Sequence, residues 1–337
     1  MHPARDLAAR QGTLREHNLA LALRHIAHSP HPVSRADLSA TTGLTRATTS
    51  SLADELVAGG LVREVGPTPR SGAGRPATGL VLADAGPAGL GLEINVDYLA
   101  ACLVDLTGAV RETVVRDADL RGQAPEAVVR RLAEVATAVV AAPSASELTV
   151  AGTCVAVPGL VQAGTVRLAP NLDWRDVPLA DLLAGALVGG DAPVAVDNEA
   201  NLAAQGEAAQ APGGSFLYVS GEIGIGAGVV LDGTLLRGAH GWAGELGHFT
   251  IEPDGPACHC GSRGCLEQYA GQDAILGAAG VPRETGQAAL RLMQSRAEAS
   301  DTAMLAALRR AGTALGVSVA GAVNLLDLRT VVLGGGY

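Results

Sequence analysis

Lysine is absent from this chain of 337 residues, because all 24 basic residues are arginines. Without lysine the chain cannot carry a Walker-type phosphate loop or form a Schiff base between a side-chain amine and a carbonyl. Two other features are lacking: an apolar run of the roughly 18 residues that a membrane span needs, and an apolar signal segment near the N-terminus. The sequence therefore argues against a membrane or secreted protein and predicts a cytoplasmic one.

The net charge of −10 is unevenly divided along the chain. Residues 1–80 contain nine Arg and six Asp or Glu, a balance of +3, whereas the remainder contains fifteen Arg and twenty-eight acids, a balance of −13. A basic head on an acidic body is typical of a protein whose head binds nucleic acid. The length allows two or three domains, at about 100–200 residues each.

The first 65 residues have the pattern of a winged helix-turn-helix. Ser34 and Thr45 are predicted helix N-caps, and Gly43 supplies a tight turn between the two helices. The pattern predicts three helices and a strand, over residues 14–28, 35–41, 46–58 and 61–65. The apolar face of the first helix is formed by Leu14, Leu19, Leu21, Leu23 and Ile26.

The helix over 46–58 is the predicted recognition helix, with Arg46 as the main reader of bases. It precedes a Gly/Pro/Arg-rich segment, residues 66–79, which we interpret as a wing tip and linker. A small helical bundle that binds protein is the alternative, but the basic linker favours DNA. The predicted DNA contacts, including two linker arginines that reach phosphates or the minor groove, are Thr45, Arg46, Thr48, Thr49, Arg70 and Arg75.

From residue 80 onward, strands alternate with helices in two similar halves. Strands over 90–95 and 98–105 are joined by a turn, and residues 215–231 repeat this unit about 125 residues later. The duplication predicts a two-lobed α/β protein with a ligand cleft between the lobes. The predicted lobes span residues 80–190 and 191–337.

A cysteine-rich loop in the second half has the spacing of a metal site. Cys258, Cys260 and Cys265 lie in a C-x-C-x4-C pattern, and His248 lies ten residues upstream of the first. Three thiolates and one imidazole complete the tetrahedral coordination of Zn²⁺ and leave no open position. The sequence therefore predicts one structural zinc ion per chain.

Several separate motifs together resemble the ROK family of repressors, open reading frames and kinases. They are the winged head with its GRP-containing linker, VPGLV at 157–161, APNLDW at 169–174, DNEAN at 197–201 and the GELGH–CHCGSRGC–LE block. The resemblance implies the duplicated, actin-like sugar-kinase (RNase H-like) fold. It also implies that the winged head marks a transcriptional repressor, since the family's kinases lack it.

The resemblance also implies which residues hold a sugar. Its polar groups match Asn198, Glu245, His248 and Glu267, and the residue at position 199 is the catalytic base in the family's kinases. Carboxylates suit this role because they accept strong hydrogen bonds from hydroxyl groups. With Asn171 of the APNLDW motif, the predicted ligand-binding residues are Asn171, Asn198, Glu199, Glu245, His248 and Glu267.

Three departures from the family's kinase pattern predict the loss of phosphoryl transfer. The kinases carry Asp-x-Gly-Gly-Thr where residues 93–97 read Glu-Ile-Asn-Val-Asp, so both glycines that let the backbone approach phosphate are gone. The carboxylate of Asp97 would repel a phosphate charge about 4 Å away by about 4 kcal/mol at an effective dielectric constant of about 20. In addition, Ile223 replaces a hydroxyl-bearing threonine, and Glu199 occupies the position of the catalytic aspartate.

Together these features predict a sugar-responsive transcriptional repressor. We expect a homodimer or higher homo-oligomer that binds an inverted-repeat operator. An ATP-dependent sugar kinase with a fused DNA-binding head is the main alternative, and a constitutive DNA-binding protein with a vestigial cleft is a third. Because family members continue for several helices beyond the strand that matches VVLGGGY (331–337), we also expect a C-terminally shortened second lobe.

Overall fold

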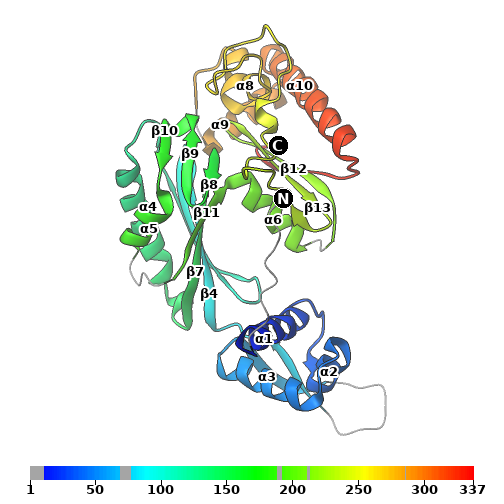
Figure 1. Ribbon diagram of the computed structural model, residues 1–337. Coiled ribbons are helices and arrows are strands. Elements are labelled where there is room, and N and C mark those ends of the chain that lie inside the picture. Colours follow the sequence, from blue (N-terminus) through cyan, green and yellow to red (C-terminus); the bar gives the residue numbers. More distant parts are fainter. Residues whose placement is uncertain (1–10, 69–76, 188–191, 211–212, 285) are drawn as a thin grey trace. The chain divides into compact units, whose positions relative to one another are not determined.

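The computed structural model describes residues 11–68, 77–187, 192–210, 213–284 and 286–337 (Figure 1). The chain separates into two compact units. The first contains the winged head and adjoining parts of the chain (103–112 and 140–151), and the second contains most of the α/β region. No helix in the described residues is long and apolar enough to cross a membrane.

Three helices and a three-stranded sheet of order β1-β3-β2 form the head. Its buried core is made by apolar side chains of all three helices and of the sheet, among them Ile26, Leu38, Leu56 and Leu80. The elements are α1 (Gln11–Ala27), β1 (Val33–Ser34), α2 (Arg35–Thr42), α3 (Arg46–Ala58), β2 (Val62–Thr68) and β3 (Ala77–Leu82).

Local hydrogen bonds set the ends of the two helices of the helix-turn-helix. Ser34 Oγ accepts from the backbone N–H of Asp37 at 3.2 Å, and Asp37 Oδ2 accepts in return from the Ser34 N–H at 3.2 Å, which is a complete capping box. Gly43 ends α2 in the left-handed region with φ 71°. Thr45 caps α3 by accepting from the N–H of Thr48 at 3.2 Å. The predicted caps and turn are therefore confirmed.

The wing of the head extends further along the chain than the sequence predicted. Strand β3 pairs antiparallel with β2, with Val65 opposite Gly79 and Val62 opposite Leu82. Residues 77–82 therefore belong to the head, whereas the predicted boundaries assigned them to the linker and to the first lobe. The sequence did not predict this strand for two reasons. The Gly/Pro/Arg-rich composition of residues 66–79 is typical of a linker, and only the pairing of β3 with β2 identifies it as a strand.

The first lobe is built on a five-stranded sheet of order β11-β7-β4-β5-β6, with α4 and α5 on one face (Figure 1). Strand β11 runs parallel to β7, with Val196 opposite Val155. The first lobe therefore reaches Asn198, and the predicted boundary at 190/191 is too early. The elements are β4 (Gly86–Ile94), β5 (Tyr98–Asp105), β6 (Val110–Asp117), α4 (Pro125–Val140), β7 (Leu148–Val157), α5 (Leu179–Ala186) and β11 (Val194–Asn198). A small sheet of β8 (Leu160–Gln162), β9 (Thr165–Ala169) and β10 (Trp174–Val177) lies beside it (Figure 1).

The second lobe repeats the strand-turn-strand unit in a four-stranded sheet of order β14-β13-β12-β15. Strand β12 is antiparallel to β13 and parallel to β15. The predicted hairpin turn at Asp232-Gly233 is present, with φ 50° and 74° at its two residues. The elements are α6 (Glu199–Gln210), β12 (Phe216–Gly221), β13 (Ile225–Leu231), β14 (Thr234–Leu235), α7 (Glu267–Ala270), α8 (Gln272–Ala278), α9 (Gly286–Glu298), α10 (Thr302–Leu326) and β15 (Val331–Gly335).

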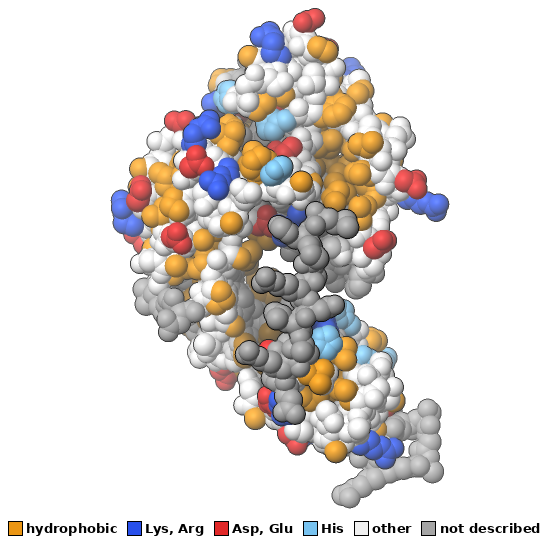
Figure 2. Space-filling view, viewed as in Figure 1, with side chains coloured by type: hydrophobic (Ala, Val, Ile, Leu, Met, Phe, Trp, Pro, Cys, Tyr) orange, Lys and Arg blue, Asp and Glu red, His pale blue; other side chains and the backbone are white. Residues whose placement is uncertain are grey.

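Helix α10 presents an unusually apolar outer surface. Its inner face buries Met304, Ala307 and Ala311 in the core of the second lobe. On the outer face, Val317 is 52% exposed and Leu325 is 84% exposed. Figure 2 shows hydrophobic side chains gathered over this part of the molecule. A surface helix normally carries polar residues on its outer face, so this surface differs from an ordinary solvated one.

Candidate functional site

A pocket opens in the second unit where the strands of the first lobe end. Part of its lining consists of residues that come directly after strands of the first lobe: Asn95 after β4, Pro158 and Gly159 after β7, and Glu199 after β11. The opposite wall is the turn from β12 into β13 together with the start of β13, residues 222–227. The pocket is open to solvent, and the empty space of about 680 Å³ within it is continuous with that solvent. All six predicted ligand-binding residues line it: Asn171, Asn198, Glu199, Glu245, His248 and Glu267.

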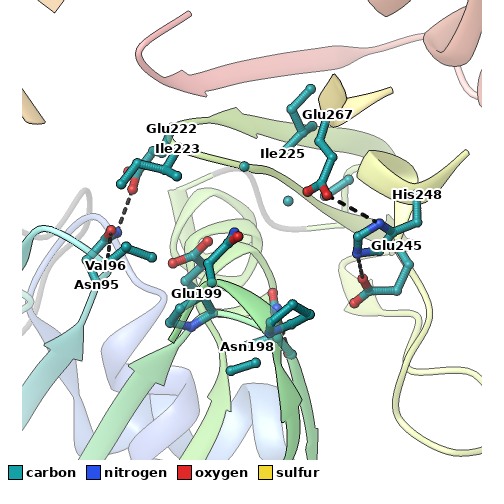
Figure 3. Close-up of a pocket in the computed structure, with 18 residues that line it drawn as sticks. Asn95, Val96, Asn198, Glu199, Glu222, Ile223, Ile225, Glu245, His248 and Glu267 are labelled. Atoms are coloured by element: carbon teal, nitrogen blue, oxygen red, sulfur yellow. Dashed lines mark hydrogen bonds and ion pairs between the residues drawn. The ribbon is translucent and has the colours of Figure 1, made fainter. Parts of the chain in front are cut away.

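Two carboxylates flank His248 at one end of the pocket (Figure 3). Its Nε2 lies 3.8 Å from Glu245 Oε2, and its Nδ1 lies 3.8 Å from Glu267 Oε1. A Cβ atom added at Gly224 would lie 3.3 Å from both Asn171 Nδ2 and Glu267 Oε2, so these two side chains meet at the same glycine. This end of the pocket thus offers acceptors and donors suited to several hydroxyl groups.

Asn198 lines the pocket, and most of its side-chain hydrogen bonds are made to the protein backbone. Its Nδ2 donates to the carbonyl oxygen of Gly159 at 2.9 Å. Its Oδ1 accepts from the N–H groups of Ala200 and Asn201 at 2.9 and 3.3 Å, which caps the first turn of α6. Asn198 therefore ties the end of β11 to the turn after β7, and one amide hydrogen remains for a ligand.

Glu199 is the first residue of α6, and its carboxyl group lies at the centre of the pocket (Figure 3). Its Oε2 is inaccessible to solvent and has no hydrogen-bond partner among the described residues. Burial, together with the nearby charges of Glu222, Glu93, Glu245 and Asp97, raises the pKa of this carboxyl group well above its ordinary value. Glu199 is therefore poised to carry a proton and to donate a hydrogen bond.

The side chain of Asn95 makes the hydrogen bonds that hold the turn after β4. Asn95 Oδ1 accepts from the backbone N–H of Val96 at 2.6 Å. Asn95 Nδ2 donates to Glu222 Oε2 at 2.5 Å, which joins this turn to the start of the β12–β13 turn. The N–H group of Val96 is consequently satisfied within the protein rather than directed at an anion.

Four potential metal ligands lie together beside the pocket. The ligand atoms of His248, Cys258, Cys260 and Cys265 all lie within 4.8 Å of one another. Cys260 Sγ and Cys265 Sγ are 3.7 Å apart, and Cys258 Sγ is 3.7 Å from His248 Nδ1. Tetrahedral coordination with bonds of about 2.3 Å to sulfur and about 2.0–2.1 Å to nitrogen requires separations of about 3.6–3.8 Å. This donor set can therefore hold a metal ion.

The backbone of the cysteine loop depends on Gly264. This residue adopts φ 65°, and a Cβ atom there would overlap the carbonyl oxygen of Glu252. The neighbouring bridge between Thr250 and Cys265 fixes the last cysteine against the strand-like segment that follows His248. His259, between two of the cysteines, is exposed and outside the cluster, as predicted.

On the head, the start of α3 carries the predicted DNA-binding side chains. Thr45 and Arg46 are exposed, Thr48 is half-buried, and Thr45 Oγ1 lies 2.9 Å from Thr48 Oγ1. Among the described residues Arg46 has no ion-pair partner, whereas Arg15 and Arg35 are paired with acidic groups of the head. The predicted contacts Arg70 and Arg75 lie outside the described residues.

Thr49, one of the predicted DNA contacts on the recognition helix, is buried, so that prediction is wrong. Its side chain is 0% exposed, because it lies on the same helical face as Leu52, Ala53 and Leu56, which pack into the head. Thr49 therefore cannot reach DNA in this conformation.

Sequence reasoning missed Glu222 as a pocket residue. It lines the pocket and bonds Asn95, which lies 127 positions earlier in the chain. A second missed pair is Glu93 and Tyr98, whose hydroxyl donates to Glu93 Oε1 at 2.5 Å. The only signal in the sequence was the position of Glu222 directly before Ile223 in the glycine-rich GEIGIG segment.

Two different family models match the two parts of the chain. The model of the ROK family matches residues 89–337, and the model of the MarR family matches residues 20–72. The chain belongs to the ROK family. The predicted family and the predicted fold, a helix-turn-helix head followed by the actin-like ROK domain, are thereby confirmed.

Individual ROK proteins resemble the chain over different lengths. A xylose repressor of Bacillus spizizenii is 32% identical over 331 residues, which cover 96% of this chain and 83% of that protein. The crystal structure of a ROK family transcriptional regulator, a homologue of the E. coli MLC protein, matches with a TM-score of 0.76 and 29% identity over 96% of this chain and 84% of that one. A ROK family glucokinase from Streptomyces griseus, in complex with glucose and AMPPNP, matches with a TM-score of 0.61 and 28% identity, over 74% of this chain and 83% of that one. The similarity to the kinase is therefore less extensive than the similarity to the regulators.

Proposed function

We propose that this ROK protein is a sugar-responsive, DNA-binding transcriptional regulator that acts as a repressor. The observation that carries the proposal is the presence on one chain of a winged helix-turn-helix head and a polar pocket beside a metal-ligand cluster. The xylose repressor and the structurally similar regulator both match across 96% of this chain, head included.

In this proposal α3 enters the major groove of DNA with its first turn. Arg46 reads a base, Thr45 and Thr48 contact the neighbouring backbone, and Arg70 and Arg75 reach phosphates or the minor groove. Because Thr49 is buried, it packs on the inner side of the helix and makes no contact with DNA in this proposal. A homodimer would present two such helices to an inverted repeat with half-site centres about 34–36 Å apart or a multiple of that spacing.

Arg46→Ala is expected to weaken binding to the operator by about 1–3 kcal/mol and to relax specificity at one base position. The side chain is exposed and lies outside the core, so the head should remain folded. Fluorescence anisotropy on the operator and on single-base variants measures both effects, with Arg309→Ala on the exposed side of α10 as the control. Equal weakening on every DNA sequence would contradict a base-reading role and make Arg46 a phosphate contact.

At the other end of the chain, the pocket binds a sugar effector. Asn171, Glu245, His248 and Glu267 contact hydroxyl groups, Glu199 contacts a further oxygen, and Asn198 positions the end of β11. Sugar binding between the lobes favours one lobe arrangement over another, and its differential affinity for the two arrangements supplies the free energy that changes DNA affinity.

The four-ligand cluster holds one structural Zn²⁺ ion in this account. The separations of 3.7 Å fit tetrahedral coordination. Since Nδ1 of His248 faces the cysteines and Nε2 faces Glu245, coordination fixes the ring tautomer and leaves the Nε2 hydrogen for a sugar oxygen. The metal would thus stabilise the loop and orient one ligand-binding side chain.

The same pocket lacks the means to position a transferring phosphoryl group. The N–H of Val96 is bonded to Asn95, Ile223 has no hydroxyl, and Asn95 bonds Glu222 across the turn. Glu199 lies at the position of the kinase base, and burial together with neighbouring acids raises its pKa, which disfavours the charged form that a base needs. A base must be deprotonated before it can accept a proton from a hydroxyl group.

We therefore expect no sugar-dependent formation of ADP from ATP. A coupled assay with D-glucose, D-xylose and N-acetyl-D-glucosamine should give the same rate with and without sugar. The kinase with a fused DNA-binding head remains the alternative, and sugar-dependent ADP formation that disappears in Glu199→Gln would establish it.

A further inference from the structure

Residues 83–85 connect β3 of the winged head to β4 of the first lobe, and they continue the hydrogen bonding of the head's own sheet. The backbone N–H of Ala83 donates to the carbonyl oxygen of Leu61 at 3.0 Å, directly beyond the paired residues of β2 and β3. Arg63 of β2 forms an ion pair with Asp84, with 3.1 Å between Nε and Oδ1. The start of the connection is therefore bonded to the head.

The end of this connection is bonded to the first lobe. The N–H of Gly86, the first residue of β4, donates to the carbonyl oxygen of Glu147 at 2.8 Å. Gly86 adopts φ 89°, and a Cβ atom there would lie 3.2 Å from the carbonyl oxygen of Gly60, so the position suits glycine. Arg111 of β6 donates through Nη1 to the carbonyl oxygen of Asp84 at 2.5 Å. Head and lobe thus contact the same few residues.

Arg111 also joins this connection to the end of β5. Its Nη1 lies 3.0 Å from Oδ2 of Asp105, whose side chain is only 2% exposed. Asp105 Oδ1 accepts from the N–H and hydroxyl groups of Thr107 and from the N–H of Ala109. Burial raises the pKa of Asp105, but the hydrogen bonds from these donors and from Arg111 outweigh it and keep the pKa below its ordinary value. A charged, buried carboxylate therefore holds the guanidinium group that bonds Asp84.

Strands β4 and β5 are hydrogen-bonded neighbours, and each has one end near the pocket and the other at this connection. Strand β4 begins at Gly86 and ends directly before Asn95, a pocket residue that bonds Glu222 of the second lobe. Strand β5 starts shortly after Asn95 and ends at Asp105, the partner of Arg111. Because paired strands and hydrogen-bond networks carry energetic coupling between distant sites, a change at the pocket is expected to reach the connection.

We propose that Arg111 is a positioning residue that couples the sugar pocket to the DNA-binding head. This inference rests on the proposed sugar-responsive function and assigns its regulation to one contact. When sugar binding favours one arrangement of the lobes, β4 and β5 carry the change to their other ends, and Arg111 passes it through Asp84 to the head. Arg111 lies on β6, outside the pocket lining and the recognition helix. Its removal should therefore weaken the coupling and leave both binding sites intact.

Anisotropy and calorimetry on the full chain test the proposal. Anisotropy on the DNA upstream of its gene gives the DNA affinity with and without saturating D-xylose, D-glucose or N-acetyl-D-glucosamine, and calorimetry gives the affinity for the same sugars. The coupling factor is the ratio of the two DNA affinities. In Arg111→Gln this factor should fall by about two- to thirtyfold. The sugar affinity and the DNA affinity without sugar should each stay within about twofold of the wild-type values.

A conservative variant and a matched control separate coupling from a structural role. Arg111→Lys keeps a cation and a donor, so it should recover part of the coupling. Arg116→Gln changes an exposed arginine of the same strand and should leave the coupling factor unchanged. Arg111→Gln leaves Asp105 as a buried charge, which can prevent folding. In that case a double variant that combines Arg111→Gln with Asp105→Asn removes the whole ion pair and tests the same contact.

Each outcome bears on the proposal. Coupling of wild-type strength in Arg111→Gln, or in the double variant, would overturn the inference alone, since sugar would still release DNA. An equal loss of DNA affinity with and without sugar would also overturn it, because Arg111 would then only support the head. If no sugar altered DNA binding by the wild-type chain, the proposed function and the inference would both fail.

Discussion

Cys260→Ser is expected to lose the bound zinc ion and several kcal/mol of stability in the second lobe. Structural zinc sites contribute about 10–16 kcal/mol of apparent binding free energy in small zinc peptides, and a serine hydroxyl is a poor substitute for a thiolate ligand. The sugar affinity should fall too, because the His248 ring is oriented by the cluster that its Nδ1 faces.

Metal analysis of chelator-washed protein, followed by urea denaturation, measures both effects. The wild-type chain should retain about one zinc ion, as a closed four-ligand site implies. Cys154→Ser is the matched control, because Cys154 lies on β7 outside the cluster. Undiminished zinc in Cys260→Ser would show that the ion is held by other groups and would contradict the assignment.

Leu52→Ala is expected to abolish DNA binding while sugar binding survives. Leu52 is a buried residue of α3, only 1% exposed, and a buried Leu→Ala change costs about 2–5 kcal/mol. A helix-turn-helix of this size has only a few kcal/mol of stability to lose. The pocket residues belong to the other compact unit, so their ligand should still bind.

Anisotropy on operator DNA and sugar calorimetry, measured on the same preparation, test this separation. Leu14→Ala is the control, since Leu14 is 55% exposed although the sequence pattern placed it on the apolar face of α1. Loss of sugar binding in Leu52→Ala would contradict this prediction, because it would mean that sugar binding by the second unit depends on the folding of the head.

Local features of this protein were readable from its sequence because their partners are near in the chain. The Ser34 capping box, the Thr45 cap and the Asp232-Gly233 turn each involve residues within a few positions of one another. The C-x-C-x4-C spacing predicted a cluster for the same reason, and the structure brings in His248 as expected.

The errors arose where the deciding partner is remote. Strand β3 was divided between the linker and the first lobe because only its pairing with β2 marks it as part of the wing. Strand β11 was placed in the wrong lobe because its partner, β7, lies about 40 residues earlier. Glu222 was overlooked because its bond to Asn95 joins two segments that only the fold brings together.

The central claim is that DNA binding and sugar binding are coupled on one chain. Its most direct test is fluorescence anisotropy of the protein on the DNA upstream of its own gene, titrated with uncharged sugars at fixed salt. We predict tight, sequence-specific binding that one sugar reverses, and Glu245→Gln should shift that titration to higher sugar concentration. Specific DNA binding that no sugar alters would contradict the account and would indicate a constitutive DNA-binding protein with a vestigial pocket.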